Sequence, residues 1–187
     1  MQDPASPADV RTIDVAVGDA PMQFPQISGY RFQKRLGQGG MATVYLAVQE
    51  SLDRTVSIKV MEREALLDET SKQRFENEAR TIAQLTHPGI VGIHEVGRTA
   101  DGRMYYIMPY LPNGDLAQRD LSDDEARIVA LLRALLSALG YAHARGILHR
   151  DVKMENVLFD ANNRPLLADF RLALSQRGRV RITTTGL

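Results

Sequence analysis

The chain has 187 residues, of which 44% are hydrophobic and 25% are charged. This length and composition are typical of one globular domain and exclude wholesale disorder and collagen-like repeats. Basic and acidic residues both number 23, so no basic field favours nucleic acid or an anionic membrane as a partner. The absence of cysteine excludes disulfides and thiolate sites, and it fits a reducing compartment.

Neither a targeting signal nor a membrane span is expected. The N-terminus has no basic region followed by an apolar stretch. The longest apolar stretch, from Ala126 to Leu139, contains Arg133 and Ser137, which make it too short and too polar to cross a bilayer. We therefore expect a cytoplasmic chain without a membrane segment.

The two ends differ from the centre of the chain. Residues 1–28 hold four of the eight prolines and are expected to form a disordered tail. Residues 171–187 contain four arginines, no acidic residue and a run of three threonines, which favours a loop.

The first half of the central region has a β-strand pattern with one helix. A helix is predicted after Thr70 as N-cap, with Gln73 as its capping-box partner. Its apolar residues Phe75, Ala79 and Ile82 keep helical spacing. Short β-branched or alternating segments predict five antiparallel strands, at Tyr30–Leu36, Thr43–Val48, Thr55–Met61, Val91–Val96 and Arg103–Met108.

The second half is predicted to be mainly helical. Pro109 to Gly114 form a connection rich in proline and glycine, and this is a hinge candidate. A long helix is expected after Ser122 as N-cap, with Glu125 as capping-box partner and Gly146 closing it. Short strands follow at Val157–Phe159 and Pro165–Leu167. The helix is expected to bury one stripe, made of Ile128, Leu132, Leu135, Leu136 and Leu139.

A glycine-rich turn lies between the first two strands. Gly37, Gly39 and Gly40 would let backbone amides approach an anion without obstruction by a Cβ atom. The same turn also fits an ordinary hairpin or the phosphate loop of a dinucleotide-binding oxidoreductase. The oxidoreductase needs a helix after the loop and an acidic residue about 20 positions on. A strand follows instead, and Ile58 and Lys59 occupy those positions.

Polar residues at strand ends and within strands suggest phosphate chemistry. Lys59 lies in an otherwise apolar strand and needs a partner, which phosphates or a helix-borne Glu76 or Glu78 would supply. The segment from His149 to Asn156 contains Asp151, Lys153 and Asn156, which offer a carboxylate to orient a hydroxyl, a cation for a phosphoryl group and an amide ligand for a metal. Asp169 follows a strand and is placed to give a second metal ligand.

These motifs, in this order and spacing, resemble those of the bacterial eukaryotic-like serine/threonine protein kinases. The resemblance runs from about residue 30 to residue 187. It implies an α+β, two-lobed protein-kinase-like fold, with a five-stranded antiparallel small lobe that carries one helix. The small lobe would span residues 29–108 and the hinge residues 109–114. Residues 115–187 would form a truncated, mainly helical large lobe that ends in the activation loop.

The resemblance also implies roles for individual residues. Asp151, Lys153, Lys59 and Glu78 would be catalytic, with Glu78 rather than Glu76 as the partner of Lys59. Asn156 and Asp169 would bind Mg²⁺, or Mn²⁺ in its place. ATP would contact Leu36, Gly37, Gly39, Gly40, Val44, Lys59, Met108, Pro109, Leu111, Asp115 and Leu158. Pro109 would offer its carbonyl and Leu111 its N–H to adenine, and Asp115 would reach the ribose.

Expected partners are ATP and proteins with Ser or Thr hydroxyls, together with a homodimer as an assembly, but no nucleic acid. The chain departs from the family pattern at Ala42, Ser57, Met154 and Arg171, and Arg171 replaces the glycine that follows Asp169 and Phe170. Together with the missing part of the large lobe, Arg171 leaves open a nucleotide-binding but inactive kinase fragment or pseudokinase. The threonines at 183–185 lie where the family carries regulatory phosphothreonines.

Overall fold

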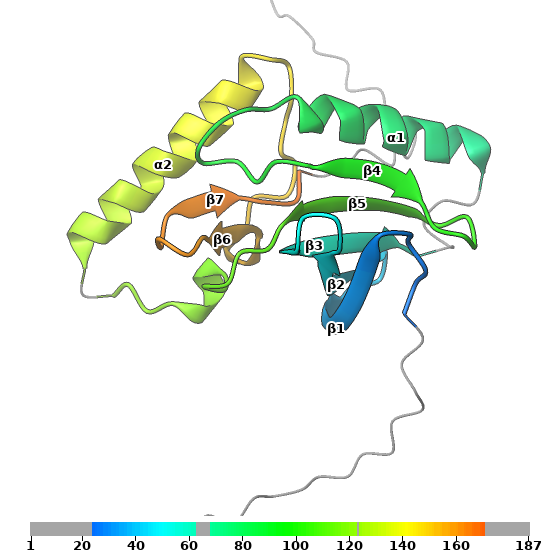
Figure 1. Cartoon of the computed structure of the whole chain (residues 1–187). Coiled ribbons are helices and arrows are strands. Elements are labelled where there is room, and N and C mark those ends of the chain that lie inside the picture. Colours follow the sequence, from blue (N-terminus) through cyan, green and yellow to red (C-terminus); the bar gives the residue numbers. More distant parts are fainter. Residues whose placement is uncertain (1–23, 63–67, 123, 171–187) are drawn as a thin grey trace, which may run out of the picture.

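The computed structural model describes residues 24–62, 68–122 and 124–170, without the side chains of Arg74 and Glu78. Its strands and helices form two lobes, drawn in chain order in Figure 1. The strands of the first lobe are β1 (Tyr30–Gln38), β2 (Ala42–Gln49), β3 (Arg54–Met61), β4 (Glu95–Arg98) and β5 (Met104–Pro109). They form one antiparallel sheet in the order β1-β2-β3-β5-β4, which confirms the predicted five-stranded sheet.

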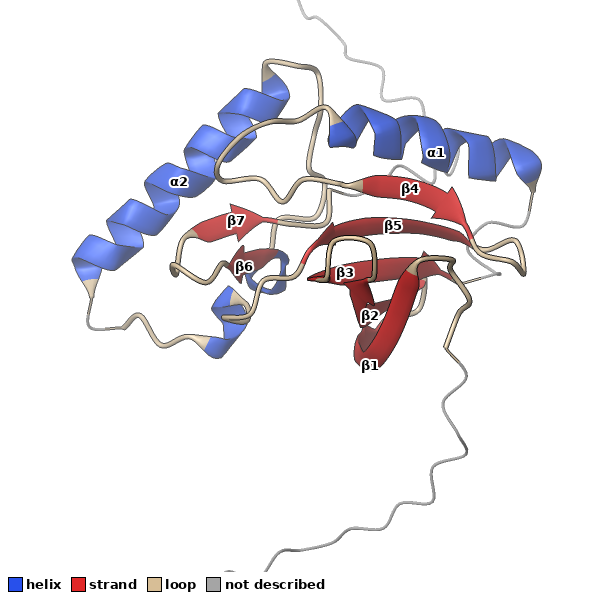
Figure 2. Cartoon of the chain, in the orientation of Figure 1, coloured by secondary structure: helices blue, strands red, loops and turns tan. Residues whose placement is uncertain are grey.

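One helix, α1 (Glu69–Ala83), covers this sheet and contacts its β4 edge (Figure 2). Its buried residues Phe75 and Ala79 join an apolar cluster with β3 and β5. The prediction of Thr70 as N-cap is wrong, because the carboxylate of Asp68 accepts the hydrogen bond from the N–H of Ser71. Both residues are suitable caps, and the helix begins earlier than its apolar pattern indicated.

The predicted strand Val91–Val96 is displaced toward its C-terminal end, to β4 at Glu95–Arg98. The cause is a competing partner in the second lobe. The N–H of Val91 donates to the carbonyl of Leu167 at 3.0 Å, and Ile90 forms an isolated bridge with Leu167. This segment therefore joins the lobes instead of extending the sheet.

The second lobe contains α2 (Glu125–His143) and a hairpin of β6 (Val157–Phe159) and β7 (Pro165–Leu167), with the short 3-10 helices η2 (Leu116–Gln118) and η3 (Met154–Asn156). Helix α2 packs against β7 (Figure 1). Asp124, rather than the predicted Ser122, caps α2 by accepting from the N–H of Arg127. Gly146 has a φ of +73°, as expected of the residue that ends a helix in the left-handed conformation.

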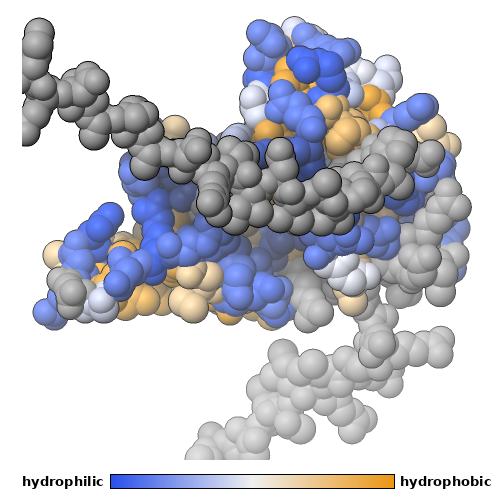
Figure 3. Space-filling view, turned by 90° about the horizontal axis from the view of Figure 1, so that it is seen from below, coloured by the Kyte–Doolittle hydropathy of each residue, from blue (hydrophilic) through white to orange (hydrophobic). Residues whose placement is uncertain are grey.

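The predicted buried stripe of α2 is only partly correct. Leu135 and Leu139 pack against the lobe's apolar cluster, but Leu132 is 52% exposed and Leu136 is 67% exposed. The fully buried residues of α2 are the small ones, Ala138 and Ala142, which let the helix lie close to its neighbours. Figure 3 shows apolar side chains on the surface at the left, the side on which α2 lies in Figure 1.

By length and composition alone α2 could cross a membrane, although one such helix is weak evidence for a span. At the other end of the described chain, Phe24–Ser28 were expected to belong to the tail. Phe24 and Ile27 instead pack on the outer side of the sheet, where the ring of Phe24 stacks on Phe32 at 5.8 Å.

Candidate active site

The loop between α2 and β6 is organised around one buried histidine. His149 is 1% exposed, and its ring lies 4.5 Å from that of Phe170. Its Nδ1 accepts from the N–H of Asp151 at 3.3 Å and its Nε2 contacts the carbonyl of Ala168 at 2.7 Å, which assigns the proton to Nε2. Burial lowers the pKa of His149 and outweighs the opposing effect of the Ala168 carbonyl. A neutral imidazole thus ties this loop to the strand end that carries Asp169.

Asp151 and Asn156 are held together within the same loop. The Nδ2 of Asn156 donates to the carbonyl of Asp151 at 2.7 Å and to its Oδ2 at 3.2 Å. Lys153 lies at the limit of an ion pair, with its Nζ 4.0 Å from the same Oδ2. Both the Asp151 and the Lys153 side chains are about half exposed, 40% and 51%, and so are accessible from solvent.

Backbone conformation also marks this region. Arg150 and Asp169 have φ values of +63° and +56°, in the left-handed region that costs free energy for a residue with a Cβ atom. Such strain is frequent at functional sites, where the surrounding contacts hold it in place. Here the contacts of His149 and Asn156 with Ala168 supply that support.

Asp169 lies next to Asn156 because the N–H of Ala168 donates to the Asn156 carbonyl at 2.8 Å. Its Oδ1 is 2.6 Å from the Nζ of Lys59 and accepts a hydrogen bond from the hydroxyl of Tyr106 at 2.9 Å. Burial raises the pKa of the Asp169 carboxyl, but the charge of Lys59 and the hydrogen bonds from Lys59 and Tyr106 more than offset it. The net pKa therefore lies below its usual range, and Asp169 is an anion.

Lys59 stands between two neighbours in the small-lobe sheet, opposite Val44 of β2 and Tyr106 of β5. The resemblance implied a pair between Lys59 and Glu78. Within the described part of the chain, the ion pair of Lys59 is with Asp169. Glu78 belongs to α1, but its side chain lies outside the described residues, so its role stays a prediction.

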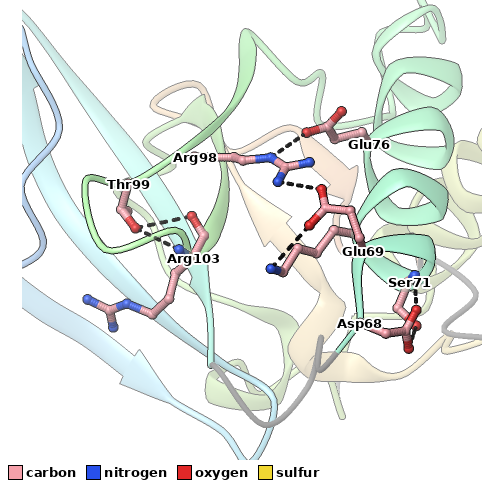
Figure 4. Close-up of polar contacts among 8 residues, drawn as sticks. Asp68, Glu69, Ser71, Glu76, Arg98, Thr99 and Arg103 are labelled. Atoms are coloured by element: carbon pink, nitrogen blue, oxygen red, sulfur yellow. Dashed lines mark hydrogen bonds and ion pairs between the residues drawn. The ribbon is translucent and has the colours of Figure 1, made fainter.

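A second charge cluster links α1 to β4. Arg98 of β4 contacts two glutamates on one face of the helix, as Figure 4 shows. Its Nη1 is 2.7 Å from Glu69 and its Nε is 3.0 Å from Glu76. Glu76, the alternative partner considered for Lys59, is thus engaged by Arg98.

The glycine-rich turn between β1 and β2 has no packing reason for its glycines. No positive φ is present at Gly37, Gly39 or Gly40. A Cβ atom would meet nothing within 4 Å at Gly37 and Gly40, and only ordinary contact at 3.7 Å at Gly39. The fold therefore tolerates a Cβ atom at these positions, and neither packing nor backbone conformation requires glycine there.

Most of the residues assigned to the adenine pocket come together. Val44, Leu111 and Leu158 are half-buried and pack against the apolar cluster that contains Met108. Leu36 is not part of this cluster and is 40% exposed. The structure thus places side chains of both lobes around one apolar surface at the hinge.

The hinge itself is tied to the second lobe. Pro109 ends β5 opposite Val56, and the N–H of Phe159 donates to the carbonyl of Gly114. Asp115, assigned to the ribose, accepts hydrogen bonds from the N–H and the Nε2 of Gln118, and so caps η2. Contact with a ribose would compete with this cap.

The donor set at this site suits Mg²⁺. Asn156 and Asp169 offer amide and carboxylate oxygens, which Mg²⁺ prefers, and Mg²⁺ is usually held by few protein ligands plus phosphates. The described residues contain no group of three or more His, Cys, Asp or Glu side chains that could hold a metal ion. The expectations for Arg171 and for the threonines at 183–185 lie outside the described residues.

Sequence reasoning missed Tyr106. Because side chains alternate between the two faces of a strand, the sequence predicts only that either Tyr105 or Tyr106 faces α1. The contact with Asp169 joins residues from different lobes, and no spacing in the sequence indicates it.

Comparison with known proteins identifies the class. The family model "Protein kinase domain" matches residues 30–185. Serine/threonine-protein kinase PknJ of Mycobacterium tuberculosis is 38% identical over 165 residues, covering 85% of this chain and 28% of that protein. Serine/threonine-protein kinase pkn3 of Myxococcus xanthus is 37% identical over 134 residues, covering 70% of this chain and 24% of that protein.

Solved structures agree. The crystal structure of the PknI kinase domain of M. tuberculosis matches with a TM-score of 0.66 and 32% identity, covering 78% of this chain and 60% of that domain. The chain belongs to the protein kinase domain family, and its fold is the protein kinase fold. It spans about a quarter of the length of the two named kinases and three fifths of the solved kinase domain.

Proposed function

We propose that the chain is the nucleotide-binding and catalytic-loop part of an ATP-dependent protein serine/threonine kinase. The observation that carries this proposal is the junction of Asp151, Asn156, Asp169 and Lys59, which hydrogen bonds and an ion pair connect across the two lobes. The relatives named serine/threonine-protein kinases support the same reaction.

The residues of the site suit phosphoryl transfer by positioning and charge stabilisation. The Asp151 carboxylate would accept a hydrogen bond from a Ser or Thr hydroxyl and take its proton. The hydroxyl oxygen then bonds to the γ-phosphorus of ATP as the bond to the β-phosphate oxygen breaks. Lys153, beside Asp151, would balance the negative charge of the transferring group.

The remaining polar residues would bind the nucleotide. Asn156 and Asp169 would hold Mg²⁺, which neutralises charge on the phosphates when bound. Lys59 would turn from Asp169 toward the α- and β-phosphates, and the amides of the glycine-rich turn would cover them. Val44, Leu111 and Leu158 would pack on adenine, while a homodimer and a cytoplasmic location stay predictions.

The test compares wild type with the Asp151→Asn variant, each expressed as the full encoded protein. Labelled phosphate from ATP should enter a generic basic protein, and Asp151→Asn should lower turnover by roughly 10²- to 10⁴-fold while ATP affinity is retained. Asp160→Asn is a matched control, because Asp160 lies in the turn after β6 and pairs with Arg164. A wild-type protein that binds ATP but transfers no phosphate would contradict the proposal and favour the inactive alternative.

A further inference from the structure

Two neighbouring tyrosines of β5 face opposite sides of the small-lobe sheet, and each donates its hydroxyl to a carboxylate. Tyr105 lies in the outer apolar cluster and donates to Glu95 of β4 at 2.9 Å. Tyr106 lies in the inner cluster, on the side of α1 and the second lobe, and donates to Asp169 at 2.9 Å. The same phenol–carboxylate hydrogen bond thus occurs once within the sheet and once between the lobes.

The surroundings of Tyr106 give no other use for its hydroxyl. The residue is 6% exposed, its ring stacks on Phe75 with centroids 6.3 Å apart, and the inner cluster around it is otherwise mostly aliphatic. An apolar side chain would fill such a position without a polar group to satisfy. A buried hydroxyl is costly unless it is hydrogen-bonded, and a bond to a carboxylate is among the stronger ones. Asp169 is that partner.

Among the described residues, the other group that contacts the Asp169 carboxylate is Lys59, which has a second task. Both Lys59 and Tyr106 contact the same oxygen, Oδ1. In the proposed function Lys59 neutralises phosphates, so its contact with Asp169 weakens when nucleotide binds. The hydroxyl of Tyr106 has no comparable task, and its ring is held by Phe75.

We propose that Tyr106 is a positioning residue for the metal-binding carboxylate. It holds Oδ1 of Asp169 from the small lobe, so that the carboxylate keeps the orientation in which it would bind the divalent cation when Lys59 turns to the nucleotide. This inference rests on the proposed nucleotide and metal site.

The space beside this contact limits what can replace the hydroxyl. A cavity of about 20 Å³ is lined by Tyr106, Asp169, Met108 and Phe170, among others. This is room for about one water molecule. In Tyr106→Phe, a water could therefore contact Asp169, but it would not be fixed to the sheet as the phenol is.

The experiment measures metal affinity separately from nucleotide affinity in the 187-residue chain. Mn²⁺ serves as probe, because it takes the same oxygen ligands as Mg²⁺ and its unbound ion is detected by electron paramagnetic resonance. Mn²⁺ is titrated at saturating ADP, with the same ADP solution without protein as the blank for Mn²⁺ held by free ADP, and ADP affinity without metal is measured by calorimetry in EDTA. Tyr106→Phe should weaken Mn²⁺ binding by about 10- to 100-fold, as loss of a partner of a metal ligand typically does, with metal-free ADP affinity unchanged.

Two controls make the result specific. Tyr105→Phe removes the equivalent hydroxyl on the opposite face and should change neither affinity. Tyr106→Phe should have no further effect on Mn²⁺ in an Asp169→Asn background, because the two residues act through one contact. If Tyr106→Phe disturbs the fold, Tyr106→Met is the second variant, because methionine also lacks the hydroxyl and adapts to irregular space. It should show the same loss of Mn²⁺ affinity.

Unchanged Mn²⁺ affinity in a folded Tyr106→Phe protein overturns the inference. Parallel losses of Mn²⁺ and metal-free ADP binding also overturn it, because they indicate damage to packing. A wild-type chain that binds no ADP under either condition contradicts the proposed function itself, and this inference with it. These outcomes separate the two claims.

Discussion

Replacement of Phe75 by alanine should destabilise the fold strongly, because this side chain joins α1 to the sheet. Phe75 is 1% exposed, and its ring stacks on Tyr106 at an interplanar angle of 30°. The cluster around it includes Met61, Ala79 and Met104 from three different elements. A Phe→Ala change in such a core removes transfer free energy and leaves a cavity, at a typical cost of about 3–5 kcal/mol.

Urea unfolding of the 187-residue chain, followed by circular dichroism, measures this cost. With a denaturant slope of about 2 kcal/mol/M, the midpoint should fall by roughly 1.5–2.5 M. Leu136→Ala in α2 is the control, because a side chain 67% exposed should change the free energy of unfolding by about 0.5 kcal/mol or less. A loss of about 0.5 kcal/mol or less for Phe75→Ala, which is the range of surface substitutions, would refute the reasoning that Phe75 anchors α1.

Three further predictions follow from the site. Gly37→Ala and Gly40→Ala should not lower the melting temperature, since a Cβ atom at either position meets nothing within 4 Å. They should weaken ATP binding about tenfold or more in calorimetry through loss of backbone contacts, and unchanged affinity would argue for a plain hairpin turn. The pKa of His149 is lowered in the fold, so the unfolded chain binds more protons and stability should fall as the pH drops below about 6.5. An NMR titration of His149 at or above 6.5 would contradict this. Arg98→Gln should speed hydrogen exchange in α1, because Arg98 links the helix to β4 through Glu69 and Glu76. Arg80→Gln, at a weaker contact of 3.9 Å, should not, and equal exchange in both variants would contradict a stabilising role of Arg98.

The sequence alone determined the order of the elements and which residues of the loop before β6 lie together. Strand alternation predicted the five-stranded sheet, since period-two patterns depend only on which residues face the core. Asp151, Lys153 and Asn156 lie together in the structure because they are close in sequence, while their roles stay predictions. The end of α2 near Gly146 was predictable for an equally local reason, because glycine readily adopts the left-handed backbone that follows a helix.

Tertiary contacts decided what several local signals left open. Asp68 and Thr70, like Asp124 and Ser122, are competing caps, and local sequence does not rank them. The strand expected to begin at Val91 begins later, because the N–H of Val91 donates to the carbonyl of Leu167 instead.

Packing partners decided the rest. In α2 the alanines, not Leu132 and Leu136, are fully buried, because close approach to β7 favours small side chains. The junction of Lys59, Tyr106 and Asp169 was beyond sequence reasoning for the same cause. It joins three segments far apart in the chain, and only the packing of one lobe against the other brings the phenol hydroxyl and the ammonium group to one carboxylate oxygen.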